Sequence, residues 1–207
     1  MLAVSRRIGE NSLRAREEAP ENLFGMGRNM GRSLRGQTLG LLGCGRIGKR
    51  TAEIAAALGM RCIGYSWHGV NHPQVESVTL PELLAQSDVL SLHCPLTQET
   101  RRLLDRSALA RMKQGSILIN TARGAIVDCD ALADTLESGH LRGAGLDVYP
   151  DEPHIPPRLI ALPQVGLTPH IGTNTQETRQ RMAEGCARQI ADALAGKRPA
   201  HVVNGIE

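Results

Sequence analysis

Short apolar runs alternate with longer amphipathic stretches along the chain from Gln37 onward. The apolar runs are β-prone and predict strands at Thr38–Leu42, Arg61–Tyr65, Asp88–His93, Ser116–Asn120, Leu141–Val148 and Val165–Leu167. The stretches between and after them predict helices at Ile47–Leu58, Leu80–Ala85, Ser107–Met112, Asp128–Ser138 and Gln176–Ala195. This alternation is typical of a parallel sheet covered by helices on both faces. We therefore expect an α/β fold with a doubly wound, Rossmann-like parallel sheet.

Single residues mark the ends of some predicted helices. Pro81 stands in the first turn of one helix, Asp128 is a suitable N-cap for another, and Gly139 closes that second helix. The chain before Gln37 is instead rich in Arg, Glu, Asn and Gly, and it predicts one short helix near Leu2–Ile8 followed by a loop. We therefore expect a crossover segment, 1–36, ahead of the main domain, 37–207.

The composition argues against several classes of partner. Of the 207 residues, 41% are hydrophobic and 22% charged, and the net charge of +3 arises from interspersed charges of both signs. We expect no nucleic-acid partner and no membrane partner, because there is no basic run and no apolar run approaches the roughly 20 residues of a membrane helix. The start of the chain also lacks the apolar core of a secretion signal.

The cysteines and histidines predict a compartment and argue against a metal site. The five cysteines are odd in number and scattered, which indicates free thiols in a reducing compartment, and we expect the cytoplasm. His68, His72, His93 and Cys94 do not show the spacing of metal ligands, and no metal is expected.

A glycine motif follows the first predicted strand. Gly43, Gly45 and Gly48 form a GxGxxG between that strand and a helix, which is the context that a dinucleotide fingerprint requires. The first glycine permits the tight turn, the second lets backbone amides approach a pyrophosphate, and the third lets the helix pack against the strand. We therefore expect 37–207 to be a dinucleotide-binding domain, with the phosphates at the amino end of the helix.

The tip of the second predicted strand bears on the choice of cofactor. A fingerprint of this kind ordinarily ends there with an acidic residue that binds the adenosine ribose, but the chain has Ser66, followed by Trp67 and His68. Ser66 does not repel a 2′-phosphate, and His68 could pair with one. We expect NAD or NADP as cofactor, with NADP slightly favoured. The alternative is that Ser66 only ends the strand and that His68 is a solvated loop residue.

Three further segments follow the glycine motif in order. They are Asn120–Gly124 with Val127–Asp128, then Gly145–Pro153, then Thr168–Thr173. Together with the GxGxxG, the chain resembles the D-isomer-specific 2-hydroxyacid dehydrogenases, a family that includes phosphoglycerate dehydrogenases and glyoxylate/hydroxypyruvate reductases. The loop Leu92–Thr97 is also similar to a family loop beside the nicotinamide ribose. The resemblance implies an oxidoreductase that transfers a hydride between a nicotinamide cofactor and a small 2-keto or 2-hydroxy acid.

The chemistry of such a reaction needs three groups that the chain can supply. A cation must bind the carboxylate, a proton donor must serve the developing alkoxide, and a carboxylate must keep that donor charged. By resemblance, Arg123 binds and activates the substrate, His170 is the acid/base, and Glu152 pairs with the imidazole. Asp147 resembles a family aspartate near the nicotinamide. The alternatives are a surface arginine, a structural histidine and carboxylates that fix their own loops.

The fingerprint and the resemblance together define a set of expected cofactor contacts. They are Gly43, Gly45, Arg46, Ile47, Gly48, Ser66, Cys94, Pro95, Thr121, Ala122, Arg123, Asp147, His170 and Gly172.

The family also has a smaller amino-terminal substrate domain, which we do not find in this sequence. We therefore expect the helices Leu2–Ile8 and Gln176–Ala195 to present apolar faces without a partner in the chain, and we expect a homodimer. Because substrate choice in the family depends largely on the other domain, the particular 2-keto acid stays open. The alternative function is a non-catalytic, dinucleotide-responsive binding module left by truncation of such an enzyme.

Overall fold

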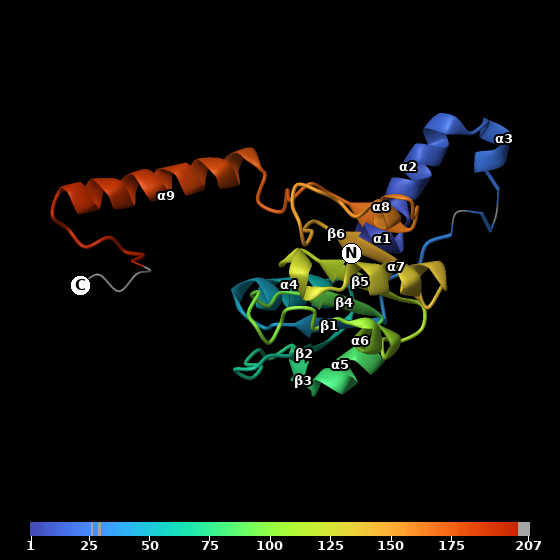
Figure 1. Cartoon of the computed structure of the whole chain (residues 1–207), viewed down its shortest axis with the longest axis horizontal. Helices are drawn as coiled ribbons and strands as arrows, with labels where there is room; N and C mark the ends of the chain where they lie inside the picture. The colour runs from blue at the N-terminus through green and yellow to red at the C-terminus, as the bar shows by residue number, and fades with distance from the viewer. Residues whose placement is uncertain (26, 29, 203–207) are drawn as a thin grey trace. The chain divides into compact units, whose positions relative to one another are not determined.

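The computed structural model describes residues 1–25, 27–28 and 30–202 (Figure 1). The chain divides into two compact units, Met1–Pro169 and His170–Glu207. The first unit contains the whole sheet, and the second contains the helix α9 (Gln176–Leu194). The boundary expected between the crossover segment, 1–36, and the dinucleotide-binding domain, 37–207, lies inside the first unit and stays a prediction.

Seven parallel strands form the sheet in the order β3-β2-β1-β4-β5-β6-β7. Their bounds are β1 Thr38–Leu42, β2 Arg61–Tyr65, β3 Val75–Ser77, β4 Val89–Leu92, β5 Ser116–Asn120, β6 Leu141–Leu146 and β7 Val165–Leu167. The doubly wound, Rossmann-like α/β fold is thereby confirmed. The strand order reverses between β1 and β4, and such a switch point is where open α/β sheets bind ligands.

Helices cover both faces of the sheet (Figure 1). Those after β1 in the first unit are α4 Arg46–Ala57, α5 Leu80–Gln86, α6 Arg106–Ala110, the 3-10 turn η1 Gly124–Ile126, α7 Cys129–Glu137 and α8 Pro157–Ile160. Those before it are α1 Leu2–Ser5, α2 Ile8–Glu17 and α3 Pro20–Leu23. One buried cluster includes side chains of α5 to α8, and a second includes alanines of α4, with partly buried Val4 of α1 packed against it. Alternate residues of the strands supply the two clusters, as the pleat requires.

The helix ends confirm the predicted signals. Pro81 lies in the first turn of α5, where Thr79 and Glu82 form a capping box. The Asp128 carboxylate accepts hydrogen bonds at 3.2 Å from the first-turn amides of α7. Gly139 follows α7 with a φ of 73°, a conformation that favours glycine.

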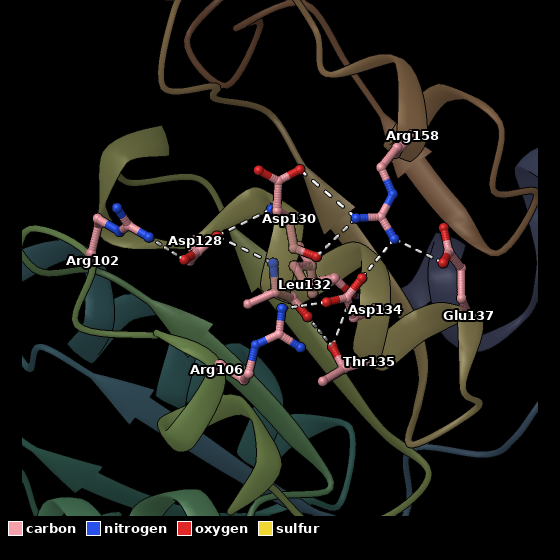
Figure 2. A network of polar contacts seen from close by, with 10 residues as sticks. Arg102, Arg106, Asp128, Asp130, Leu132, Asp134, Thr135, Glu137 and Arg158 are labelled. Atoms are coloured by element: carbon pink, nitrogen blue, oxygen red, sulfur yellow. Dashed lines mark hydrogen bonds and ion pairs between the residues drawn. The ribbon is translucent and has the colours of Figure 1, made fainter.

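An ion-pair network ties α8 to α7 (Figure 2). The Arg158 guanidinium of α8 donates to Asp134 at 2.6 Å and to Glu137 at 2.8 Å, and Arg106 of α6 donates to Asp134 at 2.5 Å. The hydrogen bonds from Arg158 and Arg106 lower the pKa of the Asp134 carboxyl. Each ion pair is exposed and contributes little by itself. Together the pairs connect α8, which lies between β6 and β7 along the chain, to α7.

The expected loop after the first helix is wrong, because α2 occupies Ile8–Glu17. None of its side chains is buried, so no apolar periodicity marks it in the sequence. Arg14 donates to Glu18 at 2.6 Å, one turn further along the chain, and this pair supports the helix. The helix predicted near Leu2–Ile8 is broken at Arg7, whose φ is 53°. The short elements β3 and α8 were also not predicted. Only Val75 of the three residues of β3 is apolar, and the four residues of α8 are too few to show a helical period.

The prediction that the first helix has an unpartnered apolar face is wrong for Val4. A Cβ built at Gly143 or Gly145 would lie 3.0 or 3.1 Å from a Val4 methyl group. These glycines of β6 therefore make room for α1 on the sheet. Leu2 and Ile8 do stay exposed, at 53% and 55%.

In α9, none of the side chains is buried, and Met182, Ile190 and Leu194 are exposed. Among the residues that the structure describes, no helix has the length and apolar character to cross a membrane. All five cysteines are free thiols.

Candidate functional site

The ends of the central strands meet at one edge of the sheet. Leu42 pairs with Leu92, Leu92 with Asn120, Asn120 with Leu146, and Leu146 with Leu167. Each predicted site segment of the first unit follows one of the strands in this edge. The structure therefore brings together loops that lie more than a hundred residues apart along the chain, from Gly43 to Thr168.

Two glycines of the motif are required by close backbone contacts. Gly43 has a φ of 98°, and a Cβ there would lie 2.7 Å from the Cys94 amide nitrogen. A Cβ at Gly48 would lie 2.3 Å from the Gly43 carbonyl oxygen. Both distances are far below van der Waals contact. A larger residue at Gly43 would push the turn away from the backbone after β4, and one at Gly48 would push α4 away from the turn.

The remaining glycine of the motif, Gly45, faces open space. A Cβ there would meet no atom within 4 Å, and this residue is the N-cap of α4 without a side-chain hydrogen bond. The first amides of α4 are therefore not capped by a side chain at this position. A cavity of about 530 Å³ lies here, lined by Gly45, Arg46, Ile47, Arg50, Thr51 and His93. We call Gly43, Gly45, Gly48 and His93 the cofactor cradle, because the phosphates of the cofactor are expected here: uncapped amides at a helix start favour an anion.

His93 belongs to this cradle but was not among the predicted contacts. Its Nε2 lies 2.9 Å from the Ser91 hydroxyl oxygen, and burial lowers the pKa of the imidazole to about 4. The ring is therefore neutral at pH 7. Its position directly after β4, beside the switch point, is the sequence signal that could have indicated it. The neighbouring predicted contact Cys94 is buried, and burial raises the pKa of its thiol to about 11.

The tip of β2 has an aromatic pair and no carboxylate. The rings of Tyr65 and Trp67 meet edge to face with their centroids 5.1 Å apart, and Trp67 is 45% exposed. Ser66 lies between them in sequence. The role of Ser66 in cofactor choice stays a prediction.

The buried amide of Asn120 shapes the turn that presents Arg123. Its Nδ2 donates to the Arg123 carbonyl at 3.0 Å, and its Oδ1 accepts from the Ala122 amide at 3.0 Å. The Arg123 guanidinium donates to the Ala122 carbonyl at 2.6 Å, and its side chain is exposed. The residues of the Asn120–Gly124 motif thus form one hydrogen-bonded turn at the end of β5.

The loop after β6 is fastened to both of its neighbours. The Asp147 amide donates to the Asn120 carbonyl at 3.0 Å, and the Thr168 hydroxyl donates to the Asp147 carboxylate at 2.6 Å. The Tyr149 amide donates to the Glu152 carboxylate at 3.0 Å. We call residues 120–124, 147–152 and 168–169 the substrate-side loops, because they contain or precede the residues predicted to act on the substrate.

His170 begins the second unit, and its φ of 52° lies in the left-handed region that non-glycine residues seldom adopt. Such strain often accompanies functional positions. Gly172 follows in the same unit. The roles of His170, Glu152 and Arg123, and the pairing of His170 with Glu152, stay predictions. Within the described residues, no group of three His, Cys, Asp or Glu side chains could hold a metal ion.

Comparison with known proteins decides the family. The sequence profile described as "D-isomer specific 2-hydroxyacid dehydrogenase, NAD binding domain" matches residues 1–172. The chain belongs to this family. It is 46% identical to the glyoxylate reductase of Aeropyrum pernix, over 84% of this chain and 54% of that protein. It is 40% identical to the D-3-phosphoglycerate dehydrogenase of Mycobacterium leprae, over 99% of this chain and 39% of that protein.

Solved structures agree with the family. The TT0316 protein of Thermus thermophilus matches with a TM-score of 0.92 and 46% identity, over 98% of this chain and 65% of that one. An acyclic imino acid reductase in complex with NADPH and D-Arg has a TM-score of 0.86 at 33% identity, over 98% of this chain and 64% of that one. The D-lactate dehydrogenase of Lactobacillus jensenii with NAD+ has a TM-score of 0.86 at 29% identity, over 98% of this chain and 65% of that one. The chain thus spans between about two fifths and two thirds of the length of these relatives.

Proposed function

We propose that the chain is the cofactor-binding part of an oxidoreductase that transfers a hydride between NAD or NADP and a small 2-keto or 2-hydroxy acid. The observation that carries this proposal is the cofactor cradle. Its glycines let the start of α4 contact the turn after β1 and let that turn contact the backbone after β4, and the position of Gly45 opens into the adjoining cavity. The residues fit a dinucleotide, because a pyrophosphate needs uncapped helix amides and room for close approach to the backbone.

A bound reduced nicotinamide supplies the hydride. The side chains that we assign to the rest of the reaction are Arg123, which binds the substrate carboxylate, and His170, which gives a proton to the alkoxide oxygen. Glu152 keeps the imidazolium charged, and Asp147 borders the nicotinamide. The planar guanidinium of Arg123 suits a carboxylate because it offers two parallel donors.

The substrate class follows from the family and from this set of groups. The relatives include a glyoxylate reductase and a D-3-phosphoglycerate dehydrogenase, and solved relatives hold NADPH or NAD. We therefore propose a small 2-keto acid as substrate, a nicotinamide dinucleotide as cofactor, and a homodimer in the cytoplasm. Exposed Leu2, Ile8 and Leu13 provide apolar surface that a second copy could cover.

Cofactor binding is tested with a substitution that the fold tolerates. Gly45→Ala places a methyl group in open space, and Gly45 has a φ of −73°, which alanine adopts freely. We expect unchanged thermal stability but at least a tenfold weaker affinity for NADH, or about 1.4 kcal/mol, because the methyl group occupies the pyrophosphate position. Energy transfer from Trp67, the single tryptophan, to bound NADH measures the affinity.

The matched control is Gly9→Ala, since a Cβ at Gly9 also meets nothing within 4 Å. Equal NADH affinity in the Gly45→Ala and unmodified chains would contradict the proposed cradle. Turnover is assayed with a panel of 2-keto acids on this chain and on a chimera with the amino-terminal part of the Aeropyrum pernix glyoxylate reductase. We expect the chain alone to bind NADH without turnover, and the chimera to reduce at least one acid. Binding without turnover in both would favour a non-catalytic binding module.

A further inference from the structure

One residue, Tyr149, connects all three substrate-side loops through its side chain and its backbone. Tyr149 is buried, with 5% of its surface exposed, and its hydroxyl donates to the Thr168 carbonyl at 3.0 Å and to the Leu146 carbonyl at 3.2 Å. Its ring belongs to the core cluster under α5 to α8. The hydroxyl thus reaches from the loop after β6 to the end of β7.

The backbone of the same residue contacts the turn after β5. A Cβ at Gly124 would lie 1.9 Å from the Tyr149 carbonyl carbon and 2.4 Å from the Pro150 nitrogen. The backbones of the two loops are therefore in direct contact directly after Arg123. The Tyr149 amide also holds the Glu152 carboxylate at 3.0 Å. Tyr149 thus contacts the turn that contains Arg123, the Glu152 carboxylate and the end of β7.

The hydroxyl is not needed to fill the core. Packing of the ring would be satisfied by phenylalanine, whereas the bond to the Thr168 carbonyl requires an O–H donor. The Leu146 carbonyl has another partner, since it accepts the Thr168 amide at 3.0 Å. Burial raises the pKa of the Tyr149 phenol, so the group stays a donor throughout the neutral range. The Thr168 hydroxyl adds a second link to Asp147 at 2.6 Å.

We propose that Tyr149 is a positioning residue of the site, whose buried hydroxyl holds the ends of β6 and β7 together and thereby fixes Asp147 and Glu152 relative to the Arg123 turn. This inference rests on the proposed function for its catalytic consequence. Its structural content concerns the chain alone. Tyr149 itself contacts neither substrate nor cofactor in this role.

The test is Tyr149→Phe, which deletes the hydroxyl and keeps the ring. The matched control is Thr135→Val in α7, which deletes a hydroxyl that also donates to two backbone carbonyls, at 2.8 and 3.2 Å. Amide hydrogen exchange of the full chain is followed at Asp147, Tyr149 and Thr168, with urea unfolding as the measure of global stability. We compare the exchange rates of the two variants after allowing for any difference in their global stability. We expect exchange at these three amides to be about tenfold faster in Tyr149→Phe than in Thr135→Val.

The catalytic consequence is read in the active chimera. Tyr149→Phe should lower kcat about tenfold and leave the KM for the cofactor within about twofold, because the cofactor cradle does not depend on this hydroxyl. Thr135→Val should change neither. A Thr168→Val variant removes the hydrogen bond from the Thr168 hydroxyl to Asp147. If this bond and the Tyr149 hydroxyl hold the same two strand ends, the double variant should lose less activation free energy than the sum of the two single variants.

The outcomes separate the two proposals. If the chimera reduces no keto acid, the proposed function fails, and the exchange rates in the chain alone still judge the role of Tyr149. If the chimera is active and Tyr149→Phe matches Thr135→Val in exchange and in kcat, the role of Tyr149 is overturned and the proposed function stands.

Discussion

The cofactor cradle and the substrate-side loops lie along one edge of the sheet but are held in different ways. The cradle depends on glycines whose missing side chains permit contact between backbones, as at Gly43 and Gly48. The substrate-side loops depend mainly on hydrogen bonds from side chains, in particular those of Asn120, Tyr149 and Thr168. Added atoms should therefore damage the cradle, whereas removed polar atoms should damage the loops.

Gly124 differs from the rest of the substrate-side loops, because its missing side chain permits a close backbone contact, as in the cofactor cradle. Gly124→Ala would place a methyl carbon 1.9 Å from the Tyr149 carbonyl carbon, where backbone rather than a flexible side chain must move. We expect a loss of about 3 kcal/mol or more in the free energy of unfolding, measured by urea denaturation. Gly9→Ala is the control. A loss below about 1 kcal/mol, which is closer to the effect of an ordinary surface change, would show that the two loops are not in tight contact.

Arg123 tests whether the loops serve catalysis. Arg123→Lys keeps the charge but loses the planar pair of donors, so we expect kcat/KM for the 2-keto acid in the chimera to fall about a hundredfold, or roughly 2.7 kcal/mol. Affinity for NADH should fall much less than kcat/KM, because the cofactor cradle is unchanged. Arg111→Lys, an exposed position at the end of α6, is the matched control. Near-normal turnover in the Arg123 variant would refute the role in substrate binding.

His93 brings a pH dependence into the cradle. Its folded-state pKa of about 4 lies below the ordinary value of 6.5, so the unfolded chain binds more protons between these pH values. The resulting stability is fully present above about pH 6.5 and is lost as the pH falls toward 4. We expect His93→Gln to remove about 2 kcal/mol of this pH-dependent difference.

The measurement for His93 is urea unfolding between about pH 7 and pH 4.5, on the unmodified chain and the variant. His201→Gln replaces an exposed histidine and serves as control. If the free energy of unfolding changed with pH to the same extent in the unmodified chain and in the His93 variant, the ring would not be held neutral in the fold.

A substitution at Ser66, directly after β2, tests the expected position of the adenosine ribose and has the smallest expected effect. We expect NADPH to be accepted and slightly favoured, and Ser66→Asp to shift the affinity ratio toward NADH by about tenfold, or roughly 1.4 kcal/mol, because a carboxylate repels a 2′-phosphate. Ser77→Asp adds the same charge at the end of the adjacent strand β3 and is the control. If both variants shift the ratio equally, discrimination does not depend on the tip of β2.

The sequence determined the fold class, six of the seven strands and the glycine motif, because these depend on local patterns of apolar residues and on the backbone freedom of glycine. It also indicated the helix starts marked by Pro81 in the first turn of α5 and by the N-cap Asp128 of α7, since both signals act within a few residues along the chain. It did not indicate α2, whose side chains are all unburied and whose support comes from charge pairs.

Tertiary structure alone decided the contacts between segments distant in sequence. The packing of Val4 on the glycines of β6, the place of His93 in the cavity wall, and the bond from Tyr149 to Thr168 all join residues that no local pattern links. Tyr149 and Gly124 both stand within recognised motifs, but their contact depends on the register of β5 with β6. Local patterns determine which elements form, whereas the pairing of strands determines which of their ends meet and so which side chains can act together.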